Sequence, residues 1–451
     1  MERQFDLIVI GTGAAGSPVA YKCRQAGWSV AIIDSRPFGG TCALRGCDPK
    51  KVLVGAADIV DWTRRMKGKG VAAPNAGIDW RALMQFKRTF TEPVPESREQ
   101  GYENAGIATF HGRVRFVDHT RLRLGEDVLT GRYIHIAAGA RPATLGISGE
   151  NYLMTSDQFL ELEDMPREIT FVGGGYISFE FAHVAARAGA QVRIIHREAR
   201  PLEKFDPDLV EKLVKATEEA GIDLRLNAAV KSVKQAKGCL QVQVSTDGAD
   251  ESFETEMVVH GAGRVPDIDD LDLPTAGVQR EKKGVSVNKY LQSVSNSAVY
   301  AAGDAAASGG LPLTPVASME AEVVATNILE GNHRKPNYTA VPTVVFSMPP
   351  LAAVGLGEED ARKQGLKFKT NYADTSGWYS SRRVNLKHSA FKVIVEEKSG
   401  SILGAHLLGA HAEETINLFA LAIRSGLKAA DLRAMIYAYP THASDVVHML
   451  G

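Results

Sequence analysis

Two cysteines, Cys42 and Cys47, are the residues of this chain best suited to chemistry, because only four residues separate them. Arg45, Lys50 and Lys51 lie close by, and these charges, together with a helix beginning near the cysteines, would stabilise a thiolate. A disulfide across so short a loop removes little entropy from the unfolded chain, so it would be a poor structural bond. A zinc site needs about four ligands, and the sequence has no companion cluster of Cys or His with suitable spacing nearby. We therefore expect a catalytic thiol pair; two unlinked buried thiols are the alternative.

A glycine-rich loop at residues 11–16 follows an apolar run at 6–10 that predicts a buried parallel strand. A helix to about residue 25 and a second strand at 29–33, ending at Asp34, complete the unit. Glycines there let backbone N–H groups approach a pyrophosphate, and an acid after the second strand accepts hydrogen bonds from ribose hydroxyls. The pattern predicts a dinucleotide site; a tight structural turn is the alternative.

The same strand–loop–helix–strand arrangement recurs at residues 168–195, with Ser178 in place of the third glycine. Serine is small enough to preserve the packing of helix on strand. The second strand is followed by His196, Arg197 and Arg200 rather than by a carboxylate, which favours a ribose carrying a 2′-phosphate. The first loop therefore suits FAD and the second suits NADPH over NADH, unless both arginines are merely solvated.

Composition describes an ordinary globular protein. The chain has 451 residues, 52 basic and 53 acidic side chains and a net charge of -1, which gives no electrostatic footprint for wrapping nucleic acid. Four cysteines exclude a secreted disulfide scaffold. The apolar stretch at residues 7–11 is too short for a signal peptide or a membrane span, so we expect a cytoplasmic enzyme.

The expected fold is α/β, with two doubly wound, Rossmann-like nucleotide-binding domains and a C-terminal α+β domain from about residue 338. Residues 55–105 have a helical pattern that Pro93 and Pro95 interrupt. In the last domain, the pattern predicts strands at 343–346 and 391–395 and helices at 413–424 and 429–436.

The chain resembles the class I pyridine nucleotide-disulphide oxidoreductases, which include glutathione reductase, dihydrolipoamide dehydrogenase and mercuric reductase. The likeness extends over essentially the whole chain. Its motifs lie at residues 39–50 (GGTCxxxGCxPxK), 137–142 (similar to ATGxxP), 173–180 (similar to GGGYIGxE), 263–267 (similar to GRxPN), 299–304 with 313–317 (the second FAD motif), and 341–355 (the opening of the interface domain).

The resemblance implies four segments. These are 1–147, the first part of the FAD domain with a redox-active disulfide; 148–264, the NAD(P)H domain; 265–337, the second part of the FAD and central domain; and 338–451, the dimer-interface domain. A homodimer with shared active sites and a small-molecule electron acceptor is implied, with neither nucleic acid nor membrane as partner.

In that family NADPH gives hydride to FAD, and the reduced flavin opens the adjacent disulfide. By the match, Cys47 would be the thiolate at the flavin and Cys42 the sulfur that meets the substrate. Lys50 would pair with Glu180 near the reactive edge of the flavin. Tyr176 would cover the nicotinamide pocket and swing aside as NADPH binds.

The resemblance also implies the cofactor contacts, with no resident metal. Those to FAD are Gly11, Gly13, Ala15, Gly16, Asp34, Ser35, Gly40, Thr41, Cys42, Cys47, Lys50, Val114, Ala138, Gly139, Arg264, Gly303, Asp304, Leu313 and Thr314. Those to NADPH are Gly173, Gly175, Tyr176, Ile177, Glu180, His196, Arg197, Arg200 and Gly263.

Two departures from the family pattern concern proton transfer. Disulfide-reducing members carry HPTxxE near the C-terminus, whose His is the acid/base and whose Glu orients it. Here Tyr439 stands at the His position and Ser444 at the Glu position. Because tyrosine has an ordinary pKa near 10, it is a poor proton shuttle at pH 7. His442, oriented by Asp445, is a candidate replacement; a surface or interface histidine is the alternative. Near the thiols, Arg45 favours a thiolate and Asp48 opposes it, and the sequence leaves the balance open.

The leading hypothesis is an FAD-dependent oxidoreductase that passes electrons from NADPH to a Cys42–Cys47 disulfide and on to a disulfide or other small acceptor. Mercuric reductases also lack the histidine, so a metal-ion reductase is an alternative. They end in a cysteine pair, however, whereas this chain has no cysteine after Cys239. A quinone reductase (diaphorase) and, from another class, a redox-sensing flavoprotein without turnover are the remaining alternatives.

Overall fold

The computed structural model describes residues 2–73 and 75–451, which divide into two compact units. The first unit comprises the chain up to Lys51, Gln85–Ala143 and Arg264–Tyr338. The second comprises Val52–Met84, Thr144–Gly263 and Thr339–Gly451. Because each unit combines segments distant in sequence, the four domain boundaries expected from the sequence remain predictions.

The first unit is built on a sheet of parallel strands in the order β3-β2-β1-β6-β18. These are β1 (Glu2–Ile10), β2 (Val30–Asp34), β3 (Ala108–His111), β6 (Asp127–Ile136) and β18 (Val299–Ala301). The long β6 pairs with β1 and with two further strands. Its first half pairs antiparallel with β5 (Arg121–Leu124), which pairs with β4 (Arg115–Phe116), and its second half pairs parallel with β18. The parallel order is that of a doubly wound nucleotide-binding domain.

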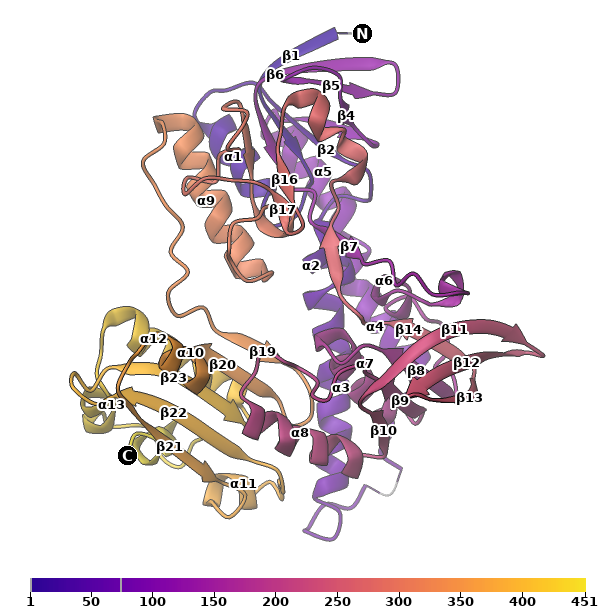
Figure 1. Ribbon diagram of the computed structural model, residues 1–451, viewed down its shortest axis with the longest axis vertical. Helices are drawn as coiled ribbons and strands as arrows, with labels where there is room; N and C mark the ends of the chain where they lie inside the picture. Colours follow the sequence, from indigo (N-terminus) through magenta and orange to yellow (C-terminus); the bar gives the residue numbers. More distant parts are fainter. Residues whose placement is uncertain (1, 74) are drawn as a thin grey trace. The chain divides into compact units, whose positions relative to one another are not determined.

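The two faces of this sheet bury alternate residues of β1. Leu7 and Val9 pack into the cluster formed with α1 (Ser17–Gln25) and α9 (Thr314–Glu330), two helices that lie side by side in Figure 1. Ile8 and Ile10 pack on the opposite face. Burial on both faces explains the continuous apolar run in the sequence.

The second unit contains another parallel sheet, in the order β10-β9-β8-β14. Its strands are β8 (Glu168–Val172), β9 (Gln191–Ile195), β10 (Ile222–Arg225) and β14 (Met257–His260), and its helices are α6 (Ser156–Phe159), α7 (Tyr176–Arg187) and α8 (Pro207–Glu219). An antiparallel sheet of β11 (Ala228–Ala236), β12 (Cys239–Thr246) and β13 (Ala249–Thr255) adjoins it.

The C-terminal part of the same unit is an antiparallel sheet in the order β19-β20-β23-β22-β21. The strands are β19 (Thr343–Val345), β20 (Leu351–Gly355), β21 (Phe368–Asp374), β22 (Ala390–Glu396) and β23 (Ile402–Leu408). The helices are α10 (Glu358–Lys363), α11 (Tyr379–Arg382), α12 (Ala412–Ser425) and α13 (Ala429–Ala434). The two doubly wound sheets and this α+β part confirm the expected fold class.

The smaller elements complete the chain. The helices are α2 (Gly40–Arg45), α3 (Cys47–Arg65), α4 (Trp80–Thr91) and α5 (Val94–Asn104), and the short strands are β7 (Ala140–Pro142), β15 (Arg264–Pro266), β16 (Arg280–Glu281) and β17 (Gly284–Val285). Pro93 caps α5, as the break there predicted, but residues 66–73 and 75–79 are not helical and α13 ends at Ala434 rather than at 436. No helix of the described residues is long and apolar enough to cross a membrane.

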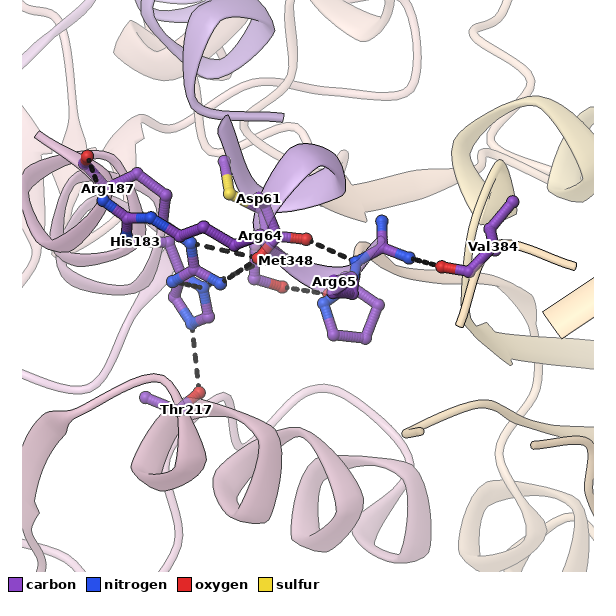
Figure 2. Close-up of polar contacts among 10 residues, drawn as sticks. Asp61, Arg64, Arg65, His183, Arg187, Thr217, Met348 and Val384 are labelled. Atoms are coloured by element: carbon purple, nitrogen blue, oxygen red, sulfur yellow. Dashed lines mark hydrogen bonds and ion pairs between the residues drawn. The ribbon is translucent and has the colours of Figure 1, made fainter. Parts of the chain in front are cut away.

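A buried ion pair holds the later turns of α3 against α7 (Figure 2). Arg187, whose side chain is 5% exposed, donates to Asp61 at 2.7 Å and to Nδ1 of His183 at 3.2 Å. That nitrogen also accepts from the amide of Met348, while Nε2 of His183 lies 3.1 Å from the hydroxyl of Thr217. The Thr217 hydroxyl donates to a backbone carbonyl, so His183 must donate from Nε2 and is neutral. Burial, and then Arg187, lower its pKa well below the ordinary value.

Candidate active site

The two cysteines lie where two helices meet. Cys42 is inside α2, and Cys47 is the first residue of α3. Both are free thiols, as expected for the reduced form of a redox pair. The sulfur of Cys47 lies 3.4 Å from Oγ1 of Thr314, at the start of α9, and the sulfur of Cys42 lies 3.8 Å from a carboxylate oxygen of Asp48.

This arrangement separates the acidities of the two thiols. A hydrogen bond from Cys42, followed by the Thr314 hydroxyl and the charge of Lys50, lowers the pKa of Cys47 to about 6, although burial and Asp48 oppose the shift. The same sulfur–sulfur hydrogen bond, burial and the negative charges of Cys47 and Asp48 raise the pKa of Cys42. At neutral pH, therefore, Cys47 is the thiolate and Cys42 keeps its proton. The balance that the sequence left open favours thiolate formation at Cys47 in spite of Asp48.

The first glycine loop is closed so tightly that side chains would not fit. A Cβ on Gly16 would lie 2.0 Å from the carbonyl oxygen of Gly11, and a Cβ on Gly40 would lie 2.4 Å from Cα of Gly13. Asp34 accepts hydrogen bonds from the amide and the hydroxyl of Thr12 at 2.9 and 2.7 Å, so this carboxylate also fixes the loop. Sequence reasoning had not assigned a role to Thr12.

The Gly303–Asp304 turn supplies a second group of polar atoms in the first unit. Burial raises the pKa of Asp304, with nearby Arg264 opposing, and its carboxylate makes no hydrogen bond with any described residue. Glu320, 1% exposed, accepts from the amide of Gly303 at 2.7 Å and from the hydroxyl of Tyr338 at 2.6 Å. Sequence reasoning missed Glu320; its signal was an acid on an otherwise apolar stretch of α9.

In the second unit, the second glycine loop lies at the carboxyl end of β8. A Cβ on Gly173 would lie 2.5 Å from the carbonyl oxygen of Gly261, and one on Gly174 would lie 2.6 Å from the ring of His196. Ser178 is fully buried beside Gly261, and its hydroxyl has no hydrogen-bond partner among the described residues. Ser178 therefore fits where the fingerprint has glycine, because Gly261, which packs against it, has no side chain.

The basic residues after β9 lie beside this loop. The side chain of Arg197 is 78% exposed and pairs with Glu198 at 2.9 Å. Nε2 of His196 lies 3.1 Å from the carbonyl oxygen of Arg200, whose guanidinium donates to the carbonyl of Glu203. Among the described residues, the ion pair of Arg197 and the side-chain hydrogen bond of Arg200 are both to near neighbours in the sequence.

Tyr176 and Glu180, on successive turns of α7, contact the segment that begins the C-terminal part of the same unit. The hydroxyl of Tyr176 is 2.7 Å from that of Thr343, and its ring lies against Phe205. Burial raises the pKa of Tyr176. Glu180 is 6% exposed and accepts from the amide of Phe346 at 3.0 Å.

The two candidates for proton transfer near the C-terminus have different surroundings. Tyr439 is 82% exposed. His442 lines a small cavity of about 40 Å³ and lies against His411, and burial, followed by His411 and Arg383, lowers its pKa to about 4. Burial raises the pKa of Asp445 and a hydrogen bond with Ser380 opposes that shift, and the orientation of the His442 ring by Asp445 stays a prediction. An imidazole with so low a pKa is a weak base, and the geometry gives His442 little support as a proton shuttle.

All residues expected to contact FAD fall in the first unit, and all those expected to contact NADPH, together with Tyr439 and His442, fall in the second. The Lys50–Glu180 pair joins one residue from each unit and stays a prediction. Val114 is buried in the core of the first unit, and Ser35 directly follows β2.

Comparison with known proteins identifies the family of the chain. Residues 5–321 match the family described as pyridine nucleotide-disulphide oxidoreductase, and residues 341–450 match the dimerisation domain of the same family. The chain belongs to the pyridine nucleotide-disulphide oxidoreductases.

Three relatives of this oxidoreductase illustrate the range of the family. The chain is 34% identical to a glutathione reductase of Burkholderia cepacia over 98% of each chain, and 30% identical to a mercuric reductase of Lysinibacillus sphaericus over 98% of this chain and 81% of that one. The solved Cu(II) complex of the HOCl-induced flavoprotein disulfide reductase RclA from Escherichia coli is 27% identical, with a TM-score of 0.88 and 99% of each chain covered.

Members of the family use FAD and NAD(P)H, and the residues present fit both groups. The Gly11–Gly16 turn leaves no room for Cβ atoms at Gly11 and Gly16, as a pyrophosphate-binding turn requires. The largely buried carboxylate of Asp304 can accept a hydrogen bond from a sugar hydroxyl. In the second unit, Ser178 lies in the first turn of α7, directly after the corresponding loop, and its buried hydroxyl has no hydrogen-bond partner among the described residues. This oxidoreductase is therefore an enzyme that works with a flavin and a nicotinamide nucleotide.

Proposed function

We propose that this oxidoreductase passes an electron pair from NADPH, through FAD, to a Cys42–Cys47 disulfide and on to a small disulfide acceptor. The observation that carries the proposal is the divided thiol pair, in which Cys47 is a thiolate at pH 7 and Cys42 retains its proton. Such a pair closes to a disulfide when it gives up two electrons. A glutathione reductase among the relatives supports a disulfide as acceptor.

The Gly11–Gly16 loop and Asp304 would hold FAD, which when bound would supply the redox chemistry that links the nicotinamide to the Cys42–Cys47 pair. The residues of this chain then divide the remaining work. Thr314 and Lys50 stabilise the Cys47 thiolate, and Cys42 is the sulfur that attacks the acceptor. Tyr176 gates the nicotinamide pocket, and its hydroxyl must leave Thr343 to do so.

Arg197 supports NADPH as the hydride donor. It follows β9, where an acid would favour an unphosphorylated ribose, and its guanidinium is exposed and held only by its neighbour Glu198. Arg197→Glu should raise KM for NADPH and lower the preference over NADH by about tenfold to a hundredfold, as loss of a charge-assisted pair implies. An unchanged ratio of kcat/KM for the two nucleotides would remove this assignment.

The decisive experiment is a kinetic panel with purified protein and NADPH. Oxidised glutathione, lipoamide, mercuric ion and menadione are compared, and Cys42→Ser and Cys47→Ser are run beside the control Cys239→Ser. We expect turnover of at least one disulfide, abolished in both active-site variants and retained in the control. A thiolate-to-flavin absorption band should persist in Cys42→Ser and vanish in Cys47→Ser; the reverse pattern would contradict the assigned roles.

A metal-ion reductase is the second candidate, and it is favoured by Tyr439 at the position of the missing histidine. The mercuric reductase relative and the Cu(II) complex of RclA give this candidate further support. Turnover of mercuric ion with no turnover of either disulfide would select it. Turnover of menadione alone would select a quinone reductase, and absence of NADPH oxidation with every acceptor would select a redox-sensing flavoprotein.

We also infer a homodimer whose active sites are shared. The match to the dimerisation domain supports the dimer, and the exposure of Ile436 (98%) and Tyr439 (82%) provides an apolar surface next to the proton-transfer motif. Sedimentation of a dilution series should show the dimer dissociating, and the activity of the same samples should fall as monomers form. An active monomer would contradict shared sites.

A further inference from the structure

A carboxylate stands beside the thiol that meets the acceptor. Asp48 is in the first turn of α3, directly after Cys47, and its Oδ1 lies 3.8 Å from the sulfur of Cys42, which donates toward it. We propose that Asp48 is the acid/base of the disulfide exchange, a role that this chain gives neither to a histidine nor to Tyr439. The inference rests on the proposed function and names the group that moves its proton.

The chemistry requires such a group. Cys42 holds its proton because the Cys47 thiolate, burial and Asp48 all raise its pKa, and a thiol is a poor nucleophile until that proton leaves. His442 is a weak base with a pKa of about 4, and Tyr439 replaces the usual imidazole. Asp48 is already within hydrogen-bond reach, and catalytic hydrogen bonds are often long before substrate is bound.

Among the described residues, three groups shift the pKa of Cys42: the Cys47 sulfur, the Thr314 hydroxyl and the Asp48 carboxylate. Lys50 acts on Cys47. The single proton of Cys42 thus has two acceptors. Transfer to Cys47 would quench the thiolate needed later, whereas transfer to Asp48 preserves it.

The exchange balances with this assignment. As the Cys42 sulfur attacks one sulfur of the acceptor disulfide, its proton passes to Asp48, a Cys42–acceptor disulfide forms, and the acceptor S–S bond breaks. The departing thiolate takes the proton from Asp48. The Cys47 thiolate then attacks Cys42, the Cys42–Cys47 disulfide forms, and the second acceptor thiolate leaves and is protonated by solvent. Two electrons pass from the cysteine pair to the acceptor.

A purely electrostatic role for Asp48 predicts the opposite effect on substitution. Asp48 raises the pKa of both cysteines by charge, so Asp48→Asn would lower both values and speed alkylation by iodoacetamide, which requires no proton for its leaving group. Loss of an acid/base would instead slow exchange with a disulfide whose leaving thiolate needs a proton. An electrostatic role of Asp48 therefore predicts faster alkylation in Asp48→Asn, whereas an acid/base role predicts slower exchange with a disulfide.

The test is stopped-flow reoxidation of the NADPH-reduced holoenzyme, with oxidised glutathione and lipoamide as probes. Asp48→Asn is compared with Asp48→Glu and with Asp58→Asn, an exposed acid ten residues further along the same helix. We expect Asp48→Asn to slow reoxidation about a hundredfold, the lower end of what general acid–base catalysis contributes, while alkylation becomes no slower. Asp48→Glu should restore part of the rate, and Asp58→Asn should match the wild type.

A second acceptor separates proton transfer from misfolding. 5,5′-Dithiobis(2-nitrobenzoate) releases a thiolate that is stable without a proton, so the loss in Asp48→Asn should be much smaller with it than with glutathione. Because both rates come from the same preparation, their ratio does not depend on the folded fraction. Equal losses with both acceptors, or wild-type reoxidation of Asp48→Asn, would overturn the inference about Asp48 alone. A wild-type enzyme that NADPH reduces but neither glutathione nor lipoamide reoxidises would overturn the proposed function.

Discussion

The hydroxyl of Thr314 helps to hold Cys47 as a thiolate, so its removal should raise the pKa of that thiol. The two groups are 3.4 Å apart, and a hydrogen bond to a charged partner contributes about 1.5–3 kcal/mol. Because Cys47 is exposed, the lower end applies, and about 1.5 kcal/mol corresponds to roughly one pKa unit. In Thr314→Val, which keeps the shape of the side chain, the pKa should therefore rise from about 6 to roughly 7.

The assay is the pH dependence of iodoacetamide alkylation of the reduced protein, with the modified cysteine identified by mass spectrometry. Thr314→Ser keeps the hydroxyl and is the matched control, so its midpoint should stay with the wild type. A Thr314→Val midpoint that does not move would refute the role of this hydrogen bond. A fall in the midpoint would show that the hydroxyl accepts from the neutral thiol rather than donating to the thiolate.

Three further predictions concern stability and cofactor retention. Asp61→Ala leaves the buried Arg187 without its carboxylate and should lower the free energy of unfolding by about 3–5 kcal/mol in chemical denaturation, whereas a loss below about 1 kcal/mol would contradict a buried pair. Gly40→Ala places a Cβ 2.4 Å from Cα of Gly13, so the purified variant should retain less flavin by absorbance; full retention would show that the loop yields. Burial lowers the pKa of His135 from its ordinary 6.5 to about 4. The neutral His135 ring therefore adds about 3 kcal/mol to the free energy of unfolding above pH 6.5, and this contribution is lost as the pH falls toward 4. Denaturation at pH 7 and pH 5 should show this loss in the wild type and less of it in His135→Asn.

The sequence alone determined the parts of this protein that depend on neighbouring residues. Gly11, Gly16 and Gly173 make close approaches that a Cβ would not allow, and the apolar runs before the two loops predicted buried strands. The spacing of Cys42 and Cys47 marked them as a reactive pair. Family motifs then predicted the two nucleotide loops and the C-terminal interface part, and the fold class was confirmed.

Tertiary structure decided what depends on residues remote in the sequence. Thr314 reaches Cys47 across 267 positions, and Glu320 reaches the amide of Gly303 across 17. Residues 66–73 and 75–79 were expected to be helical and are not; Gly68, Gly70 and Gly77 in this stretch disfavour a helix. A pKa is set by burial, hydrogen bonds and charges that converge only on folding. Residue types therefore predicted where the chemistry occurs, the family motif predicted which thiol would carry the charge, and the fold supplied the hydrogen bonds and charges that hold it there.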